Sequence, residues 1–361
     1  MVPPQVSHPD AMHFFPTLHL QGQLPARHTL LVALTTLSLS FQGSRPVVAA
    51  EGSIPGYVVR PLTLTGQGNQ ATLRVSVNGQ KTMLILDTGA PVTALDTSFF
   101  KGTVPKTGGA NQDQLPAELR RPVNANGQRA EIGMVNSLQA GPLDFGKHPV
   151  VLTDLRTNFA QYNNRFSNAQ ISGLIGQDIL QEYGAVIDWR RRGVYFNTDK
   201  TKRMKLGGGL AAAGWTAVPM SSTEGRHYTV ACTVEGQPVR LIVDTGSDFT
   251  TFTPGVVKFS HMMYNHDTGR SMSHLQSNAL TMSMINGNAV GYPAKVERWK
   301  IGNYEIASSV VLVSPVPEGL TKEHSAGDGP ILGLLGAEVL ASNSAIIDVA
   351  GSMLYLKPTK R

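Results

Sequence analysis

Two copies of one pattern dominate the sequence. Residues 84–93 read Leu-Ile-Leu-Asp-Thr-Gly-Ala-Pro-Val-Thr, and residues 241–250 read Leu-Ile-Val-Asp-Thr-Gly-Ser-Asp-Phe-Thr. In each copy, three apolar residues lead into Asp-Thr-Gly, and a Thr follows four positions after the glycine. An apolar run that ends in an acid, a hydroxyl and a glycine is typical of a buried strand entering a tight turn. The pattern therefore predicts two turns that present the carboxyl groups of Asp87 and Asp244.

Other landmarks recur at nearly constant spacing. Two pairs are 157 residues apart and three pairs are 160 apart. They are Gly79 and Gly236, Asp87 and Asp244, Gly127 and Gly287, Gly176 and Gly336, and Asp188 and Asp348. Matched spacings of this kind indicate one duplication rather than a repeat array. We expect a first unit at residues 51–198 and a second at 215–361, joined by a Lys-rich and then Gly/Ala-rich linker at 199–214.

The composition favours a globular, mainly β fold with a few short helices. Hydrophobic residues make up 41% of the 361 residues and charged residues 16%, which excludes general disorder. The chain contains 37 Gly and 22 Pro, and long helical periods are few. This combination is typical of many short strands joined by turns. Cys232 is the single cysteine, so no intrachain disulfide can form.

The positive charge is concentrated locally. The formal net charge is +6, and residues 190–205 alone contain seven Lys or Arg against one Asp. Such a patch can contact an anionic surface, but charge runs are more often solvated, and we interpret this one as a hairpin tip and linker. Basic and aromatic residues do not alternate, so the sequence gives no sign of nucleic-acid binding.

The N-terminal segment has the features of a secretory signal. Residues 1–26 are rich in proline and show no period, which predicts disorder. Arg27 then precedes an apolar run from Leu30 to Leu39, and small residues end at Ala50. This order predicts a signal peptide cleaved near Ala50, hence an exported (secreted or periplasmic) protein with no stable membrane span. A plain disordered leader is the alternative.

The two acids suggest a reaction if the units face each other across a shared axis. Two close carboxyl groups cannot both ionise cheaply, so they share a proton. The ionised member can take a proton from water while the neutral member donates to a carbonyl oxygen, which hydrolyses an amide without a metal or cofactor. Thr88 and Thr245 are suited to bond across the axis. Gly89 and Gly246 allow a sharp turn beside each acid.

A resemblance to a known family rests on these residues. Asp-Thr-Gly after an apolar strand, followed later by Leu174-Ile175-Gly176 or Leu334-Leu335-Gly336 and a short helix, resembles the pepsin and retropepsin-like aspartic proteases. The resemblance implies an all-β, bilobal pepsin-like fold of two tandem retropepsin-like β-barrel units with a cleft between them. It implies peptide-bond hydrolysis by Asp87 and Asp244. It assigns supporting roles to Thr88, Gly89, Thr245, Gly246, Ser247, Gly176 and Gly336.

Two departures from that family pattern affect the predicted site. Ala90 follows the first Asp-Thr-Gly and Ser247 follows the second. The Ser247 hydroxyl could bond to Asp244 and favour its ionised form, whereas Ala90 cannot do this for Asp87. We therefore expect an asymmetric dyad and an acidic pH optimum less extreme than that of pepsin. The hairpin at 123–134 has no aromatic residue, so Tyr292 serves as a flap tyrosine, the flaps work without one, or Tyr292 simply packs.

Several alternatives stay open at this point. The favoured function is an aspartic endopeptidase acting on a peptide or protein substrate. The fold could instead carry a peptide- or partner-binding module without catalysis, an inhibitor or scaffold with a filled cleft, or two buried acids that merely join the lobes. The ten histidines lack metal-site spacing, so we expect no metal. Because both acids belong to one chain, we expect a monomer.

Overall fold

The computed structural model describes most of the chain after residue 55. The described residues are 16–19, 56–65, 69–107, 124–125, 128–129, 131–163, 170–199, 201, 204, 206–256, 280–284, 287–307, 309–316 and 330–358. The predicted signal segment from Arg27 to Ala50 lies outside them, as do hairpin-tip residues 126–127 and 285–286.

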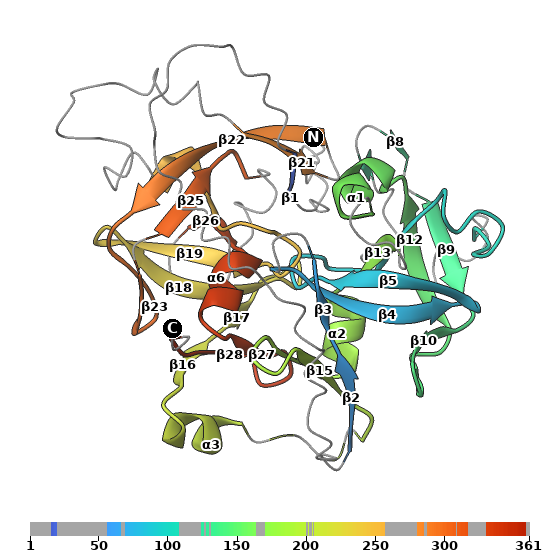
Figure 1. The fold of residues 1–361 in the computed structure, drawn as a ribbon, viewed down its shortest axis with the longest axis horizontal. Helices are drawn as coiled ribbons and strands as arrows, with labels where there is room; N and C mark the ends of the chain where they lie inside the picture. Colours follow the sequence, from blue (N-terminus) through green and yellow to red (C-terminus); the bar gives the residue numbers. More distant parts are fainter. Residues whose placement is uncertain are drawn as a thin grey trace, which may run out of the picture.

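Strands of the first half form one nine-stranded sheet within the described residues (Figure 1). In spatial order, the sheet contains β11 (Leu143–Asp144), β10 (Leu138–Ala140), β4 (Ala71–Val77), β5 (Gln80–Leu86), β13 (Ile171–Ile175), β6 (Ala94–Asp96), β12 (His148–Thr153) and β9 (Glu131–Val135), and β3 (Thr63–Leu64) pairs with β4. Strands β4 and β5 form the hairpin predicted around Gly79, which has a φ of 86°. A positive φ at this turn is the conformation that glycine adopts without strain.

The second half forms a corresponding sheet of eleven described strands. In spatial order, it contains β1 (Pro16–His19), β21 (Leu280–Met284), β22 (Gly287–Val296), β25 (Ser309–Val313), β20 (Thr251–Phe252), β26 (Ile331–Leu335), β19 (Gln237–Val243), β18 (Tyr228–Val234), β23 (Trp299–Ile301) and β24 (Tyr304–Ile306), and β17 (Ser221–Ser222) pairs with β18. From β22 to β24, this order repeats the first sheet from β9 to β11. The predicted mainly β architecture of two related units is confirmed.

Strand β1 comes from the segment that the sequence predicts to be a disordered leader. Its four residues pair antiparallel with β21, from Pro16 opposite Met284 to His19 opposite Thr281. The first sheet has no equivalent strand beside β9 among the described residues.

Each sheet is crossed at its centre in the same way. Strand β13 pairs parallel with β5 and antiparallel with β6, and β26 does the same with β19 and β20. A Cβ atom added at Gly173 would overlap the carbonyl oxygen of Ala94, and one at Gly333 would overlap that of Thr251. Glycine is therefore needed at both crossings because the backbones approach too closely for a side chain.

A third sheet joins the halves. Its six strands are β16 (Thr216–Pro219), β28 (Met353–Leu356), β27 (Ile346–Asp348), β14 (Val186–Asp188), β15 (Gly193–Asn197) and β2 (Tyr57–Pro61), in spatial order. At its centre, β14 and β27 run antiparallel with Ile187 opposite Ile347. These residues are 160 positions apart, so the pseudo-twofold axis between the halves passes between them. Main-chain pairing therefore fixes how the two halves face each other.

Helices are few and short. They are α1 (Arg156–Asn163), α2 (Gln177–Glu182), α3 (Gly207–Ala212) and α6 (Ala337–Ser342), and the small hairpin β7 (Asn124–Ala125) with β8 (Gln128–Arg129) completes the elements named here. Helices α2 and α6 follow Gly176 and Gly336, where the sequence predicts short helices. Helix α3 lies within the predicted linker.

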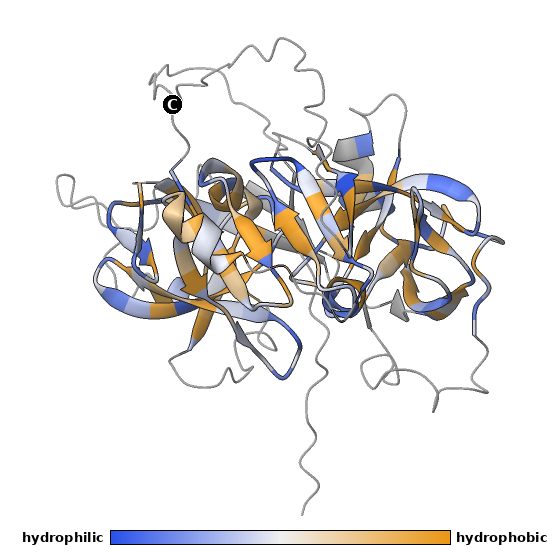
Figure 2. Cartoon of the chain, turned by 90° about the horizontal axis from the view of Figure 1, so that it is seen from below, coloured by the Kyte–Doolittle hydropathy of each residue, from blue (hydrophilic) through white to orange (hydrophobic). Residues whose placement is uncertain are grey.

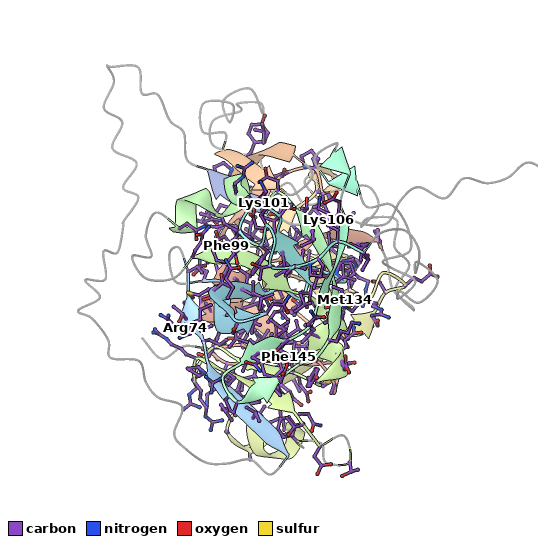
Figure 3. All side chains as sticks on the ribbon, turned by 90° about the vertical axis from the view of Figure 1, so that its right-hand side faces the viewer. Arg74, Phe99, Lys101, Lys106, Met134 and Phe145 are labelled. Atoms are coloured by element: carbon purple, nitrogen blue, oxygen red, sulfur yellow. The ribbon has the colours of Figure 1, made fainter. Side chains whose placement is uncertain are left out.

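Apolar residues fill the interior of both halves (Figure 2). The buried cluster runs through both lobes and the joining sheet, and it includes Cys232, which the sequence places in a core strand. Phe145, labelled in Figure 3, packs edge-on against Tyr183 and Phe196 at centroid distances of 4.9 and 5.0 Å. These rings connect the outer strands of the first sheet to α2 and the joining sheet, which anchors the scaffold behind the turn that contains Asp87.

Candidate active site

The central strand of each sheet delivers one acid. Strand β5 ends at Leu86 and β19 ends at Val243, one residue before Asp87 and Asp244 respectively. The Asp87 amide donates to the Ile175 carbonyl at 2.9 Å, and the Asp244 amide donates to the Leu335 carbonyl at 3.0 Å. Both aspartates are buried. The crossing strands therefore fix where each acid leaves the sheet.

Two threonines lock the turns together. The Thr88 amide donates to Thr245 Oγ1 at 3.0 Å, and the Thr245 amide donates to Thr88 Oγ1 at 3.1 Å. Each hydroxyl donates in turn across the axis, Thr88 Oγ1 to the Val243 carbonyl and Thr245 Oγ1 to the Leu86 carbonyl, both at 2.6 Å. All four bonds join one lobe to the other, as expected from the two short hydroxyls.

The glycines of the turns bring the two carboxyl groups together. The Gly89 amide donates to Asp87 Oδ1 and the Gly246 amide to Asp244 Oδ1, each at 2.9 Å. A Cβ atom at Gly89 would lie 2.6 Å from Cγ of Asp244, and a Cβ at Gly246 would overlap the carboxyl of Asp87. Each glycine thus touches both acids, so the carboxyl groups lie side by side.

Burial raises the pKa values of both acids, and the charge of Asp244 raises that of Asp87 further. The pKa of Asp87 is raised well above its ordinary value, first by burial and then by the charge of Asp244. Burial raises the pKa of Asp244 to about 6, against the opposing effects of the amides of Ser247 and Gly246 and of nearby His227. Such a coupled pair carries one proton over an intermediate pH range.

The predicted role of the Ser247 hydroxyl is wrong. This hydroxyl donates to the Phe249 carbonyl at 2.9 Å, two residues along its own turn, rather than to Asp244. The Ser247 amide instead donates to Asp244 Oδ1 at 3.0 Å. An alanine at this position would keep that amide, so the contact of Ser247 with the dyad belongs to the backbone.

Gly176 and Gly336 lie directly behind the catalytic turns. Their amides donate to Thr93 Oγ1 at 3.1 Å and to Thr250 Oγ1 at 3.0 Å. A Cβ at Gly176 would overlap the backbone of Val92, and one at Gly336 would overlap that of Phe249. The two threonines are the ones that end the repeated stretches of sequence, which explains why each follows its glycine by the same interval.

The structure adds a pair of residues that the sequence reasoning missed. Gln70 and His227, each immediately before β4 or β18, reach across the axis. Gln70 Nε2 donates to the Gly246 carbonyl, and His227 Nε2 lies 3.0 Å from the Gly89 carbonyl oxygen. Both side chains are buried. The two residues are 157 positions apart, which is the spacing of the repeat at the aspartates. The sequence did not reveal them as a pair, because a Gln in one copy and a His in the other are not matching residues.

A second missed pair lies in the helices behind the turns. Asp178 of α2 accepts from the Thr93 amide and hydroxyl at 2.8 Å and lies 3.0 Å from His148 Nε2. Glu338 of α6 accepts from the Thr250 amide at 2.6 Å, while its Oε2 is buried without a partner. Burial raises the pKa of Glu338 to about 7. The equivalent acids thus have unequal surroundings.

Two further residues or regions singled out in the sequence lie elsewhere. Tyr292 is half-buried in β22, opposite Val313 of β25, so it sits in the body of the sheet beyond the hairpin tip. Arg190 and Arg191 are exposed in the turn between β14 and β15, where Arg191 lies 3.7 Å from Asp188.

Within the residues that the structure describes, no group of three or more His, Cys, Asp or Glu side chains is arranged to hold a metal ion. No helix among them has the length and hydrophobicity needed to cross a membrane.

Many solved structures are similar to this chain, and two of them serve as examples. Basic 7S globulin from soybean matches with a TM-score of 0.44 and 12% identity, over 84% of this chain and 95% of that chain. An aspartic proteinase from Irpex lacteus matches with a TM-score of 0.40 and 15% identity, over 84% of this chain and 98% of that chain. No curated protein matches the sequence significantly.

Comparison with protein families gave a match to each repeat. The family described as aspartyl protease matches residues 73–179 and again residues 230–339. The first match contains Asp87 and Gly176, and the second contains Asp244 and Gly336. Each of the two paired turns therefore falls within its own match to the family. Because the two matches together span more than half of the sequence, the chain belongs to the aspartyl protease family.

Proposed function

We propose that the protein is an aspartic endopeptidase that hydrolyses peptide bonds with Asp87 and Asp244. One observation carries this proposal: the glycine of each turn lies against the carboxyl group of the other turn. Two buried carboxyl groups in that arrangement share a proton instead of ionising together. The raised pKa values of both acids support such sharing.

The dyad supplies both partners of general acid–base hydrolysis. The ionised carboxylate takes a proton from a water molecule as the water oxygen bonds to the carbonyl carbon of the substrate. The neutral carboxyl group donates its proton to the carbonyl oxygen. When the resulting tetrahedral intermediate collapses, the C–N bond breaks and the departing nitrogen receives a proton from the dyad. No group beyond the two acids and one water is required.

The pKa shifts define the pH range of this reaction. The active form carries one proton on the pair, so it appears as pH rises through the first ionisation and disappears through the second. Since the pKa of Asp244 is about 6, we expect kcat/KM to rise between about pH 5 and pH 6 and to fall at higher pH as Asp87 also ionises. The optimum is then mildly acidic to neutral.

Substrate, assembly and location follow as parts of the same proposal. The substrate is a peptide or an extended segment of a protein. One chain contains both acids, so a monomer suffices for catalysis. The apolar run from Leu30 to Leu39 and the small residues at Ala50 support export of the chain with cleavage near Ala50.

Cleavage of a mixed peptide library between pH 3 and pH 8 tests the proposal. The wild-type chain should cleave peptides, and Asp87→Asn and Asp244→Asn should each lower kcat/KM by at least about 10³-fold. Asp144→Asn is the matched control, because this exposed carboxylate binds Gln139 and Gly146 in the outer hairpin. Cleavage that persists in both Asn variants would refute the dyad. Peptide binding without cleavage at any pH would support the non-catalytic binding module.

A further inference from the structure

Gln70 and His227 occupy equivalent positions in the two lobes but differ in chemistry. Each side chain reaches the carbonyl of the glycine in the opposite catalytic turn. The same glycine donates its amide to the acid of its own turn. Each crossing side chain therefore holds the peptide unit that orients one carboxyl group.

The difference between an amide and an imidazole matters for charge. A glutamine side chain is neutral at every pH, whereas an imidazole can also carry a second proton and a positive charge. Nε2–H can donate to the Gly89 carbonyl in either protonation state, so the bond itself persists. Only His227 can add a positive charge beside the dyad, and this charge favours the ionised form of Asp244.

Backbone amides act on both acids, those of Gly89 and Ala90 on Asp87 and those of Ser247 and Gly246 on Asp244, so the backbone alone does not decide which acid carries the charge. Asp244 Oδ1 accepts from the amides of Gly246 and Ser247 at 2.9 and 3.0 Å. Asp87 Oδ1 accepts from the Gly89 amide at 2.9 Å. Amide donors stabilise a carboxylate more than a neutral carboxyl group.

We propose that His227 is a positioning residue that holds the first catalytic turn from the second lobe and, when protonated, keeps the negative charge of the dyad on Asp244. This rests on the proposed peptidase function and assigns roles within it. Asp244 takes the proton from water, and Asp87 donates its proton to the carbonyl oxygen of the substrate. The proton that Asp244 gains then passes to the departing nitrogen as the C–N bond breaks. Asp87 regains its proton from a hydroxyl of the collapsing tetrahedral intermediate, which becomes the carboxylic acid product, and the dyad returns to its starting state.

Other charged groups lie on the elements around His227. The catalytic turns contribute Asp87, Asp244 and Asp248, the turn before β18 contributes Glu224 and Arg226, and α2 contributes Glu182. The His227 amide donates to Thr223 Oγ1 at 3.0 Å, and the Gln181 side chain donates to the Arg226 carbonyl, so this turn is held on both sides. The charge of His227 acts to lower the pKa of Asp244.

The pH dependence of kcat/KM in a set of four proteins tests the proposal. The set is the wild type, His227→Gln, His227→Leu and Gln70→Leu. Glutamine can keep the bond to the Gly89 carbonyl, as Gln70 does on the other side, but it removes the charge. We expect His227→Gln to move the acid limb of the profile upward by about half a pH unit or more. His227→Leu should show the same movement and a lower maximum.

Gln70→Leu is the control for a purely structural role. It removes the bond to the Gly246 carbonyl without changing any charge, so it should lower the maximum and leave the acid limb where it is. An acid limb that stays in place in His227→Gln, while the Asn variants of the dyad are inactive, overturns the proposal and leaves the proposed function standing.

A measurement without substrate separates the two proposals. Carbon NMR can follow the titration of the Asp244 carboxyl group, assigned by its loss in Asp244→Asn. The midpoint should lie at higher pH in His227→Gln than in the wild type. Equal midpoints would overturn the role of His227, whereas a shifted midpoint in a chain that cleaves no peptide would retain that role and refute only the peptidase function.

Discussion

The first and second lobes build their catalytic turns with the same backbone contacts and different side chains. In both, a crossing strand accepts the amide of the acid, a threonine bonds across the axis, and a glycine lies against the opposite carboxyl. The side chains around this shared frame differ between the lobes. Gln70 in the first lobe occupies the position that His227 occupies in the second. Asp178, which pairs with His148, corresponds to Glu338, whose Oε2 lacks a partner.

This comparison separates two tasks. Backbone contacts hold the two turns together, and symmetric contacts do this equally well in both lobes. In the mechanism that we propose, side chains decide which acid carries the negative charge. This requires the halves to differ, because two identical acids in identical surroundings would share the proton evenly. Duplication within one chain permits such divergence.

The largest expected effect comes from the glycines that bring the acids together. Gly246→Ala would place a methyl group on the carboxyl of Asp87, and Gly89→Ala would place one 2.6 Å from Cγ of Asp244. Displacement of a reacting group by about 1 Å can cost 100-fold in rate, so each variant should lower kcat/KM by at least about 100-fold. Gly246→Ala should be the more damaging because its overlap is closer. Equal, mild effects measured by steady-state kinetics would contradict the close approach.

The crossed threonines should contribute equally to stability. Thr88→Val removes the hydroxyl that binds the Thr245 amide and the Val243 carbonyl, and Thr245→Val removes the equivalent bonds. Each variant leaves two buried polar groups unpaired, at a cost of about 4 kcal/mol in the free energy of unfolding. Urea unfolding of both variants measures this cost. The double variant should cost less than the sum, because the bonds share a network. A large difference between the two single variants in the loss of unfolding free energy would contradict the equal contribution of the two threonines.

Glu338 should make the stability of the folded chain depend on pH. Its pKa is about 7 in the folded chain, above the ordinary value of about 4.3, so the folded state holds the proton more tightly. The stabilisation is present below about pH 4 and is lost as pH rises toward 7, by about 3 kcal/mol in total. Unfolding free energies measured across this range should fall less steeply in Glu338→Gln than in the wild type. Parallel curves for the two proteins would show that Glu338 does not titrate in this way.

The smallest expected effect belongs to Ser247. Its hydroxyl bonds to the Phe249 carbonyl, and its amide, which an alanine keeps, bonds to Asp244. Ser247→Ala, which copies Ala90 of the first lobe, should therefore move the acid limb of the kcat/KM profile by less than about 0.3 pH unit, compared with half a unit or more for His227→Gln. A larger shift in Ser247→Ala than in His227→Gln would show that the Ser247 hydroxyl, and not His227, causes the asymmetry of the dyad.

The repeated sequence was sufficient to predict the frame. Strong apolar runs before Asp87 and Asp244 predict strands, and glycine spacing predicts the duplication, because both signals are local and repeated. The contacts of Thr88 and Thr245 across the axis follow once the two turns are assumed to meet.

The side-chain differences could not be predicted in the same way. Gln70 precedes Asp87 by 17 residues, and nothing in its neighbourhood indicates that its amide reaches Gly246 of the other lobe. Such a contact depends on how two lobes dock. The Ser247 prediction failed because a short hydroxyl can bond to the backbone of its own turn, and this one donates to the Phe249 carbonyl.

The most direct test of the central claim, that the two turns form one site within one chain, is to mix the two inactive variants. Asp87→Asn and Asp244→Asn, combined in equal amounts and assayed near pH 6, should show no more peptide cleavage than either variant alone. Each chain then lacks one acid of its only site, and the acids of different chains do not meet. Recovery of about a quarter or more of the wild-type rate would contradict the account, because it would place the working pair of carboxyl groups between chains.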